Sequence, residues 1–374
     1  MRQSYSFADQ STFFQKLRSI DYLLLLCILL VGIVGIFAMY STDGGDYLYH
    51  TQSHIIRFTT FFIMMIFISF INIKYWHSTG YLFYLIVLGL LIWTYFYGIT
   101  AQGSKRWISL YIINLQPSEL MKIAIIVFFA KYYHRMMITN VNKFKNILIP
   151  LFILIVPIFL VISQPDLGTS ILIALSGVIV LWLAGLNIKY FFYSTLIFII
   201  STPFVIAFLK PYQKLRILTF FDPDKDPLGA GYQIIQSKIA IGSGGLFGKG
   251  FLKGTQGYLE FLPEKHTDFI FTLFSEEFGF VGSLFLLIVY AIIIFRVARI
   301  GASSRNYFGR LFCYGYASAL FMYISVNMSM VLGLLPIVGS PLPIMSYGGS
   351  SMLATMIGFG IVMSTKIYNR QLII

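Results

Sequence analysis

The sequence is poor in charge and in cysteine. Only 11% of its 374 residues are charged, whereas 58% are hydrophobic; a soluble globular domain holds about 25% charged residues. The composition therefore excludes an ordinary soluble domain and is typical of a polytopic membrane protein. The two cysteines, Cys27 and Cys313, each lie in an apolar run, so we expect neither a disulfide framework nor a cysteine-based metal cluster.

Several common signals are missing as well. The first apolar run lacks a small-residue cleavage site, so we expect a retained helix and not a signal peptide. The net charge of +13 comes from basic residues scattered between the apolar segments, which argues against nucleic acid as a partner. Such residues instead indicate membrane orientation and contact with anionic lipid. The chain shows no low-complexity tract and no internal repeat.

Long apolar runs dominate the chain. A membrane-spanning helix needs about 20 mostly apolar residues, and ten segments approach this length. We therefore predict an all-α polytopic membrane protein, with a single ten-helix membrane domain over residues 1–374. The predicted spans lie near residues 21–40, 55–72, 79–97, 117–135, 147–163, 166–185, 190–209, 268–298, 308–333 and 345–366.

An even number of spans puts both termini on the same side of the membrane. With cytoplasmic termini, Lys and Arg concentrate in the inside segments, whereas the short outside loops hold Lys105 and Arg106. The positive-inside rule therefore predicts that both termini are cytoplasmic. Residues 210–267, between the seventh and eighth spans, then form a large extracytoplasmic loop. Apolar residues at helical spacing within 231–241 predict a short helix on the membrane surface.

Acidic residues are few, and this topology places nearly all of them at the outer face. Asp9 and Asp21 belong to the cytoplasmic N-terminus, whereas the others lie outside or in spans that start outside. The inward-running spans open with QPSELMK, QPDLGTS, HTDFIF and PLPIMSYGGSS. Glu119 and Asp166, in the first two, fit ordinary helix-start chemistry, since proline and an acidic side chain both suit the first turn. They fit a ligand site at the outer face equally well.

Ionisable side chains within or beside apolar runs are candidates for function. Lys122 lies three residues after Glu119 on the same helical face, so it is either an interfacial ion pair or a cation held for an anionic ligand. Asp268, at the mouth of an apolar run, is either a helix cap or a catalytic carboxylate. We expect Glu276 and Glu277, about two turns deeper, to be structural partners of buried basic groups.

Two glycine-rich stretches, at 242–250 (GSGGLFGKG) and 346–351 (SYGGSS), allow the backbone to approach a ligand closely. Neither matches a nucleotide-binding fingerprint. Backbone N–H groups beside Lys249 could hold a phosphate, although a tight turn explains the same residues. In GSKRWISL, Arg106 suits contact with a lipid or substrate phosphate, and Trp107 suits the membrane interface.

Together, GSKRWISL, QPSELMK, QPDLGTS, FLPEKHTDFIF and PLPIMSYGGSS resemble the motifs of the SEDS family (shape, elongation, division and sporulation). DPLGAGYQIIQSKIAIGSGGLFGKG, in the long loop, is similar to the family as well. The resemblance covers nearly the whole chain, in order. Within the family, PLP before SYGGSS and a chain that ends soon after the last span favour RodA, the elongation branch, over FtsW, the division branch.

The resemblance implies a peptidoglycan glycosyltransferase of the bacterial cytoplasmic (inner) membrane, with its active site facing the extracytoplasmic side. Such an enzyme polymerises lipid II into glycan strands during cell elongation and releases polyprenyl diphosphate. A class B penicillin-binding protein is the implied transpeptidase partner, beside other wall-elongation proteins. The family's essential aspartate is here Asp268, which we interpret as the general base.

The diphosphate needs positive groups or backbone donors as negative charge builds on it. We expect the outer motifs and the long loop to supply these and the remaining substrate contacts, from Arg106, Trp107, Glu119, Lys122, Asp166, Arg216, Lys249, Glu264, His266 and Ser346. A divalent cation, Mg or Mn, is a further expectation, with Glu119 or Asp166 nearby. The sequence holds no dedicated metal-ligand spacing.

The alternative function is a lipid II flippase or another transporter, and a non-catalytic scaffold is a third. A transporter is expected to place its polar site near the bilayer midplane, often at broken helices. Here the charged motifs cluster at one face, beside a large outer loop. This arrangement favours an enzyme.

Overall fold

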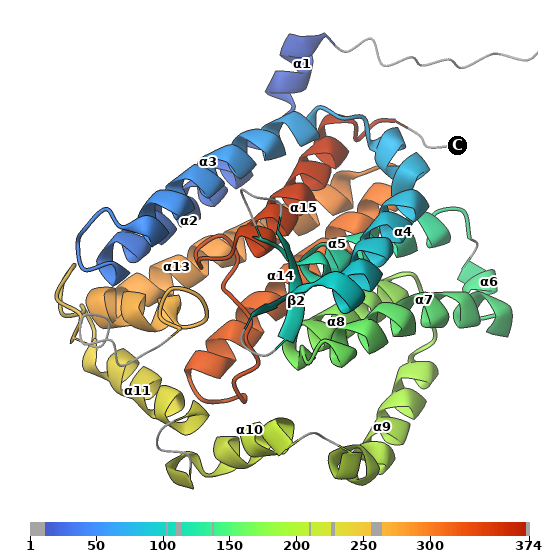
Figure 1. Ribbon diagram of the computed structural model, residues 1–374. Helices are drawn as coiled ribbons and strands as arrows, with labels where there is room; N and C mark the ends of the chain where they lie inside the picture. The colour runs from blue at the N-terminus through green and yellow to red at the C-terminus, as the bar shows by residue number, and fades with distance from the viewer. Residues whose placement is uncertain are drawn as a thin grey trace, which may run out of the picture.

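The computed structural model describes residues 12–101, 104–109, 114–136, 138–208, 211–225, 229–255 and 264–371. Within these ranges the protein is a bundle of long helices with a small β-sheet (Figure 1). Its multi-pass membrane character is evident from seven helices that are long and apolar enough to cross a membrane: α2 (Tyr22–Thr42), α3 (Tyr49–Ser69), α4 (Ile73–Tyr97), α7 (Phe144–Ser163), α13 (Ile270–Ser303), α14 (Tyr307–Val331) and α15 (Gly349–Ile367).

The three remaining predicted spans also contain helices: α5 (Pro117–Tyr133), α8 (Leu167–Leu183) and α9 (Ile188–Phe208). Every predicted span therefore holds one helix. The ten-span arrangement itself stays a prediction, because length and composition identify seven. Two short helices, α1 (Phe13–Arg18) and α6 (Ile138–Val141), lie outside the predicted spans.

The centre of the bundle is α5, which is buried along its whole length from Pro117 to Ala130. Helices α4, α8, α14 and α15 pack around it. Gly315 of α14 permits a close approach there, because a Cβ at this position would lie 2.6 Å from the Val180 side chain. Helix α9 lies at the edge of the bundle (Figure 1). It exposes large apolar side chains such as Phe192 and Phe204. Such an apolar surface suits contact with lipid, so the packing of α9 fits the membrane protein that the composition predicts.

A three-stranded antiparallel sheet joins α4 to α5, so the all-α prediction was wrong at this point. Strands β1 (Ile99–Ala101), β2 (Ser104–Ser109) and β3 (Asn114–Leu115) pair in the order β1-β2-β3. Strands this short show no recognisable period-two pattern in the sequence. Pairing of Trp107 with Ile99, and of Ile108 with Leu115, fixes β2 beside α5.

The predicted loop at 210–267 contains further structure. Its described parts include α10 (Pro211–Phe221), the 3-10 helix η1 (Pro223–Lys225) and α11 (Ala230–Ser243), which confirms the helix predicted at 231–241. Helix α11 packs on α13, and its Ser237 hydroxyl donates to the Val331 carbonyl at 2.7 Å. The chain then turns at Gly248, whose φ is +80° and whose hypothetical Cβ would lie 2.0 Å from the Glu277 carbonyl oxygen. Only glycine fits this turn.

Candidate active site

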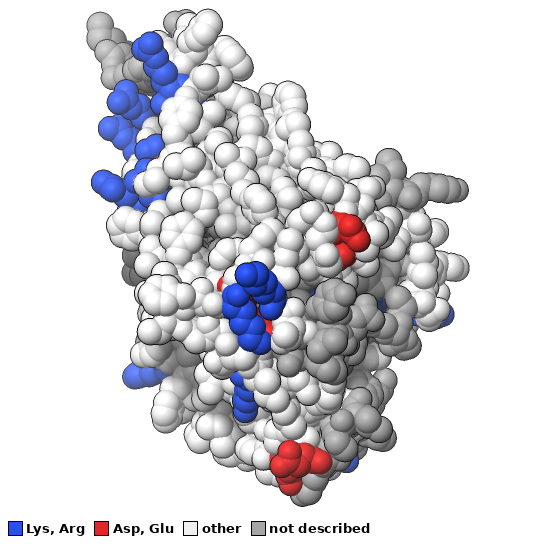
Figure 2. Space-filling model, turned by 90° about the vertical axis from the view of Figure 1, so that its left-hand side faces the viewer, with Lys and Arg blue, Asp and Glu red and all other residues white. Residues whose placement is uncertain are grey.

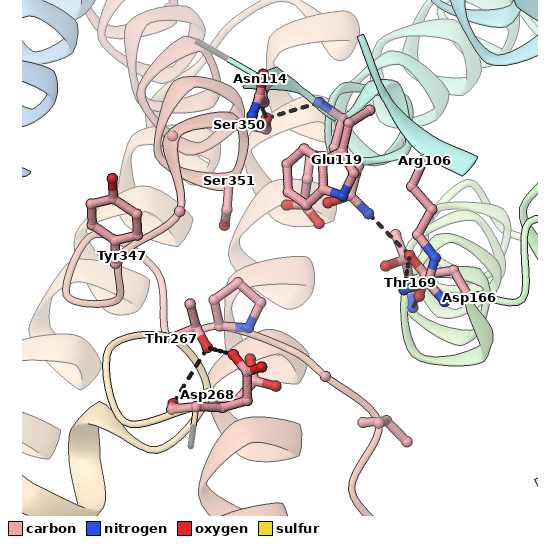
Figure 3. A pocket seen from close by; sticks show the side chains of 18 of the residues that line it. Arg106, Asn114, Glu119, Asp166, Thr169, Thr267, Asp268, Tyr347, Ser350 and Ser351 are labelled. Atoms are coloured by element: carbon pink, nitrogen blue, oxygen red, sulfur yellow. Dashed lines mark hydrogen bonds and ion pairs between the residues drawn. The ribbon is translucent and has the colours of Figure 1, made fainter. Parts of the chain in front are cut away.

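The starts of the spans that were predicted to run inward meet around a cavity of about 660 Å³ (Figure 3). Its walls come from the sheet, from the first turns of α5, α8 and α15, from the turn before α13, and from α3. Four motifs that are distant in the sequence therefore share one space. The residues predicted for the site that line the cavity are Arg106, Trp107, Glu119, Asp166, Glu264 and Asp268.

Asp268 lies in the turn that precedes α13. The N-cap of this helix is Phe269, so Asp268 is not the cap. Asn327 holds the turn, because its side-chain amide donates to the Asp268 carbonyl at 3.0 Å and to the Ser340 carbonyl at 2.7 Å. Gly339 also lines the cavity near Asp268: a Cβ there would lie at an ordinary contact distance, 3.6 Å, from Asp268 Oδ2, and it is the φ of +72° that favours glycine at this position. The carboxylate is thus presented to the cavity from a fixed backbone (Figure 3).

Asp166 has the helix-start role that the sequence allowed, and it also lines the cavity. It is the N-cap of α8, and its Oδ1 accepts from the Thr169 N–H at 3.1 Å. Its Oδ2 accepts from the Gln116 side chain at 3.0 Å and lies 3.7 Å from Arg106 Nη1. Arg106 also donates to the carbonyls of Gln164 and Pro165. The helix cap is therefore also the anchor that fixes Arg106 in the cavity wall.

Glu119 and Lys122 form a buried ion pair. Lys122 Nζ lies 2.9 Å from both carboxylate oxygens, and the two side chains are only 6% and 7% exposed. The hydroxyl of Tyr323 donates to the same carboxylate at 2.8 Å and 3.0 Å. Glu119 lines the cavity, but Lys122 is not among the lining residues. The charge of Lys122 is thus balanced inside the protein, and it does not snorkel to an interface.

Three other predicted contacts, Lys249, Ser346 and His266, lie outside the cavity wall. Lys249 Nζ binds Glu276 at 2.6 Å, which confirms that Glu276 is the partner of a basic group. Ser346 accepts from the Leu342 N–H at 2.7 Å and holds the turn before α15. His266 binds a carboxylate behind the wall, described below. Arg216 belongs to α10, and its side chain lies outside the part of the chain that the structure describes.

The sequence interpretation missed Arg57, which lines the cavity from α3. Its guanidinium lies 4.6 Å from the centroid of the Tyr347 ring, a cation–π contact. Within the described part of the chain it makes no ion pair. An arginine in an otherwise apolar span was the available signal. Ser350 was missed as well: its hydroxyl accepts from the Gln116 N–H at 2.8 Å and ties the start of α15 to the start of α5.

The expected cation site at Glu119 or Asp166 is not supported by the donor set. Both oxygens of each carboxylate already accept from protein donors, so a requirement for Mg or Mn stays a prediction. Among the described residues, the group able to supply three ligands is instead Asp43, His50 and His266, behind the cavity wall. Burial and the neighbouring His50 lower the pKa of His266, and Asp43 only partly offsets this.

Comparison with known proteins agrees with the geometry. The chain is 41% identical to the peptidoglycan glycosyltransferase MrdB of Escherichia coli K12, over 97% of this chain and 98% of MrdB. It is 33% identical to stage V sporulation protein E of Bacillus subtilis, over 95% and 99% of the two chains.

Solved structures share the fold. A chain of a peptidoglycan synthase complex, described as coordinating polymerization and crosslinking, matches with a TM-score of 0.82 and 28% identity, over 94% of this chain and 99% of that one. The rod shape determining protein RodA of Thermus thermophilus matches with a TM-score of 0.72 and 23% identity, over 94% and 98%. A family model for FtsW, RodA and SpoVE, described as cell cycle protein, matches residues 20–371. The chain therefore belongs to the FtsW–RodA–SpoVE family of cell cycle proteins, the family that its motifs resemble.

Proposed function

We propose that the chain is a peptidoglycan glycosyltransferase that polymerises lipid II into glycan strands during cell elongation. The observation that carries the proposal is the cavity, in which the Asp268 carboxylate shares one space with Arg57 and Arg106. A base and a cationic surface are the two parts that such a transfer needs. MrdB, with which the chain shares 41% identity, is named for this activity.

The reaction joins a hydroxyl of the acceptor sugar to the anomeric carbon of the donor. Asp268 accepts the proton of that hydroxyl as the general base, which requires an approach of about 3 Å between the two oxygens. The bond from the anomeric carbon to the diphosphate oxygen breaks at the same time, and polyprenyl diphosphate leaves. Trp107 and Glu264, which also line the cavity, are placed to contact the sugars.

Arg57 is the best placed cation for the leaving diphosphate. Within the described residues it has no carboxylate partner, whereas Arg106 shares its charge with Asp166 at 3.7 Å. The start of α15 adds backbone donors, because its N-cap Gly348 offers no side-chain acceptor to the first N–H groups. Such a helix start binds anions well. Lys122 acts on the site only through Glu119.

We infer a single membrane domain of ten spans over residues 1–374, in the bacterial cytoplasmic membrane, with both termini in the cytoplasm. Figure 2 supports this orientation: Lys and Arg side chains gather at the end of the molecule where α1 lies. The cavity is built from the starts of inward-running spans. It then opens on the extracytoplasmic side, where the sugars of lipid II are presented while the polyprenyl tail stays in the membrane.

The proposed partner is a class B penicillin-binding protein, which would crosslink the strands that this chain makes. The support is the matching structure of a synthase complex that coordinates polymerization and crosslinking. Other wall-elongation proteins and the surrounding lipid complete the expected contacts. Nucleic acid has no place in this proposal, because the basic residues are scattered between spans.

A lipid II flippase is the rival function, and a break within α13 is the feature that would favour it. Gly279 interrupts the helix, because its backbone angles of φ +65° and ψ −162° are not helical. Transporters often have broken helices of this kind at their substrate sites. The break is filled by the chain itself, however. A Cβ at Gly279 would lie 2.3 Å from the Gly248 nitrogen, and Phe280 donates its N–H to the Gly245 carbonyl at 2.9 Å. No ligand is needed to satisfy this backbone.

The test is a polymerisation assay with the purified chain, its penicillin-binding partner and labelled lipid II. We expect Asp268→Asn to lower the rate by about 100-fold or more, because the amide cannot take the proton. Asp46→Asn is the matched control, since Asp46 is exposed and lies outside the cavity. If Asp268→Asn made polymer at the wild-type rate, Asp268 would be excluded as the base. Transport of lipid II across vesicles without polymer would favour the flippase.

A further inference from the structure

A cluster of one carboxylate and two imidazoles lies behind the cavity wall. Asp43 follows the end of α2, His50 is in the first turn of α3, and His266 is in the turn before α13. Asp43 Oδ1 lies 3.3 Å from His50 Nδ1 and 3.1 Å from His266 Nε2. The three potential ligand atoms all lie within 4.8 Å of one another. None of the three residues lines the cavity.

We propose that this cluster binds one divalent transition-metal ion of the zinc type. Two imidazoles and a carboxylate suit Zn²⁺ and its neighbours, whereas Mg²⁺ prefers oxygen ligands alone. A tetrahedral Zn²⁺ ion with bonds of about 2.0–2.1 Å separates its ligand atoms by roughly 3.3 Å. The two measured separations from Asp43 Oδ1 agree with this spacing. Three protein ligands leave a fourth position for water.

The surroundings of Asp43 already orient it for this role. Its second oxygen, Oδ2, accepts from the Thr51 N–H at 2.9 Å and from the Thr51 hydroxyl at 2.7 Å. These two bonds fix the carboxylate and leave Oδ1 directed at both imidazoles. Partners of this kind around a ligating carboxylate raise metal affinity. The backbone of His266 is held too, because its carbonyl accepts from the Tyr347 N–H at 2.9 Å.

Binding requires a small rearrangement of the imidazoles. Their rings now stack with centroids 4.0 Å apart and an interplanar angle of 19°, and their nitrogens face the carboxylate. On metal binding, any proton on a ligating nitrogen moves to the other nitrogen of its ring or is released to solvent, and the rings turn until the two lone pairs converge on the ion. His50 has room to turn, since its side chain is 40% exposed. The same exposure gives the ion a path from solvent.

The ion would connect the α2–α3 corner to the turn that carries the proposed general base. His266 precedes Asp268 by two residues, and Tyr347, which His266 holds through its carbonyl, lines the cavity. The role is therefore a clamp that fixes the cavity wall, away from the diphosphate. Metal binding itself does not depend on the proposed glycosyl transfer, so the two ideas can fail separately.

The experiment is a cobalt titration of the full chain, purified in detergent, stripped with a chelator and freed of any affinity tag. Co²⁺ replaces Zn²⁺ in such sites and absorbs visible light when four-coordinate, and Zn²⁺ should displace it. We expect one tightly bound ion per chain. His50→Gln and Asp43→Asn should each weaken binding by about 100-fold or more, because even the loss of a residue that only supports a metal ligand lowers metal affinity by about 10–100-fold.

His77→Gln is the matched control. His77 also contacts a second histidine, His134, with ring centroids 4.8 Å apart, but the pair is not part of the three-ligand group. Thermal unfolding gives a second readout. Added Zn²⁺ should raise the Tm of wild type and of His77→Gln, and it should leave the Tm of His50→Gln unchanged. Weak binding by wild type, or equal binding by wild type and His50→Gln, would overturn the proposal.

Discussion

Replacing Lys122 by methionine separates a structural role from a substrate-binding one. The change removes one half of an ion pair whose side chains are 6% and 7% exposed, and it leaves the Glu119 carboxylate buried with Tyr323 as its remaining side-chain donor. Breaking a buried pair from one side costs about 3–5 kcal/mol. We expect a loss of this size in the free energy of unfolding, because the stranded Glu119 carboxylate is only 6% exposed and so gains little hydration in exchange for its lost partner.

The double variant Glu119→Gln/Lys122→Met tests the cause. It removes both charges, so we expect it to be more stable than Lys122→Met alone, with a coupling between the two sites of about 2 kcal/mol or more. Equilibrium unfolding of wild type, Glu119→Gln, Lys122→Met and the double variant in detergent, followed by tryptophan fluorescence, measures that coupling. A Lys122→Met protein of wild-type stability that has lost affinity for lipid II would refute the reasoning and restore Lys122 as a diphosphate ligand.

Two further predictions concern the cavity and the glycine turn. Arg57→Gln should raise the KM for lipid II by about tenfold or more, because the substrate loses a charged hydrogen bond worth roughly 1.5–3 kcal/mol. Lys105→Gln, at an exposed position on β2, is the control. An unchanged KM in Arg57→Gln would remove Arg57 from the site. Gly248→Ala should destabilise the fold by at least about 2 kcal/mol, because its Cβ would lie 2.0 Å from the Glu277 carbonyl oxygen. Gly242→Ala, which meets nothing within 4 Å, should be neutral or stabilising in the same unfolding assay, and equal losses in both variants would contradict the steric argument.

The helices and the meeting of the motifs could be predicted from the sequence, because both follow from local signals. Apolar runs locate the spans, and a proline followed by a carboxylate marks the starts of α5 and α8. Once alternate spans run in the same direction, their starts must lie at one face. Glu119, Asp166 and Asp268 were therefore expected near one another, and all three line the cavity.

The partners of the charged side chains could not be predicted in this way. Lys249 lies 27 residues from Glu276 in the sequence, and the pair forms only because the glycine turn packs against the break in α13. Tyr323, which completes the Glu119 site, comes from α14, 204 residues away. Spacing along a helix reveals a pair such as Glu119 and Lys122, but contacts between helices depend on packing that a single sequence does not encode locally.

These pairings decide which cations remain for the substrate. A charge buried in a membrane protein is costly unless it is paired. Several basic side chains of this protein form ion pairs within the fold: Lys122 with Glu119, Lys249 with Glu276, and Arg296 with Asp21. A cation that is already neutralised gains little from a diphosphate, because binding must first disrupt the existing pair. Arg57 faces the cavity with an aromatic ring as its neighbour and without an ion pair among the described residues. A diphosphate would supply the charge that Arg57 lacks, so the structure moves the expected anion contact from Lys122 to Arg57.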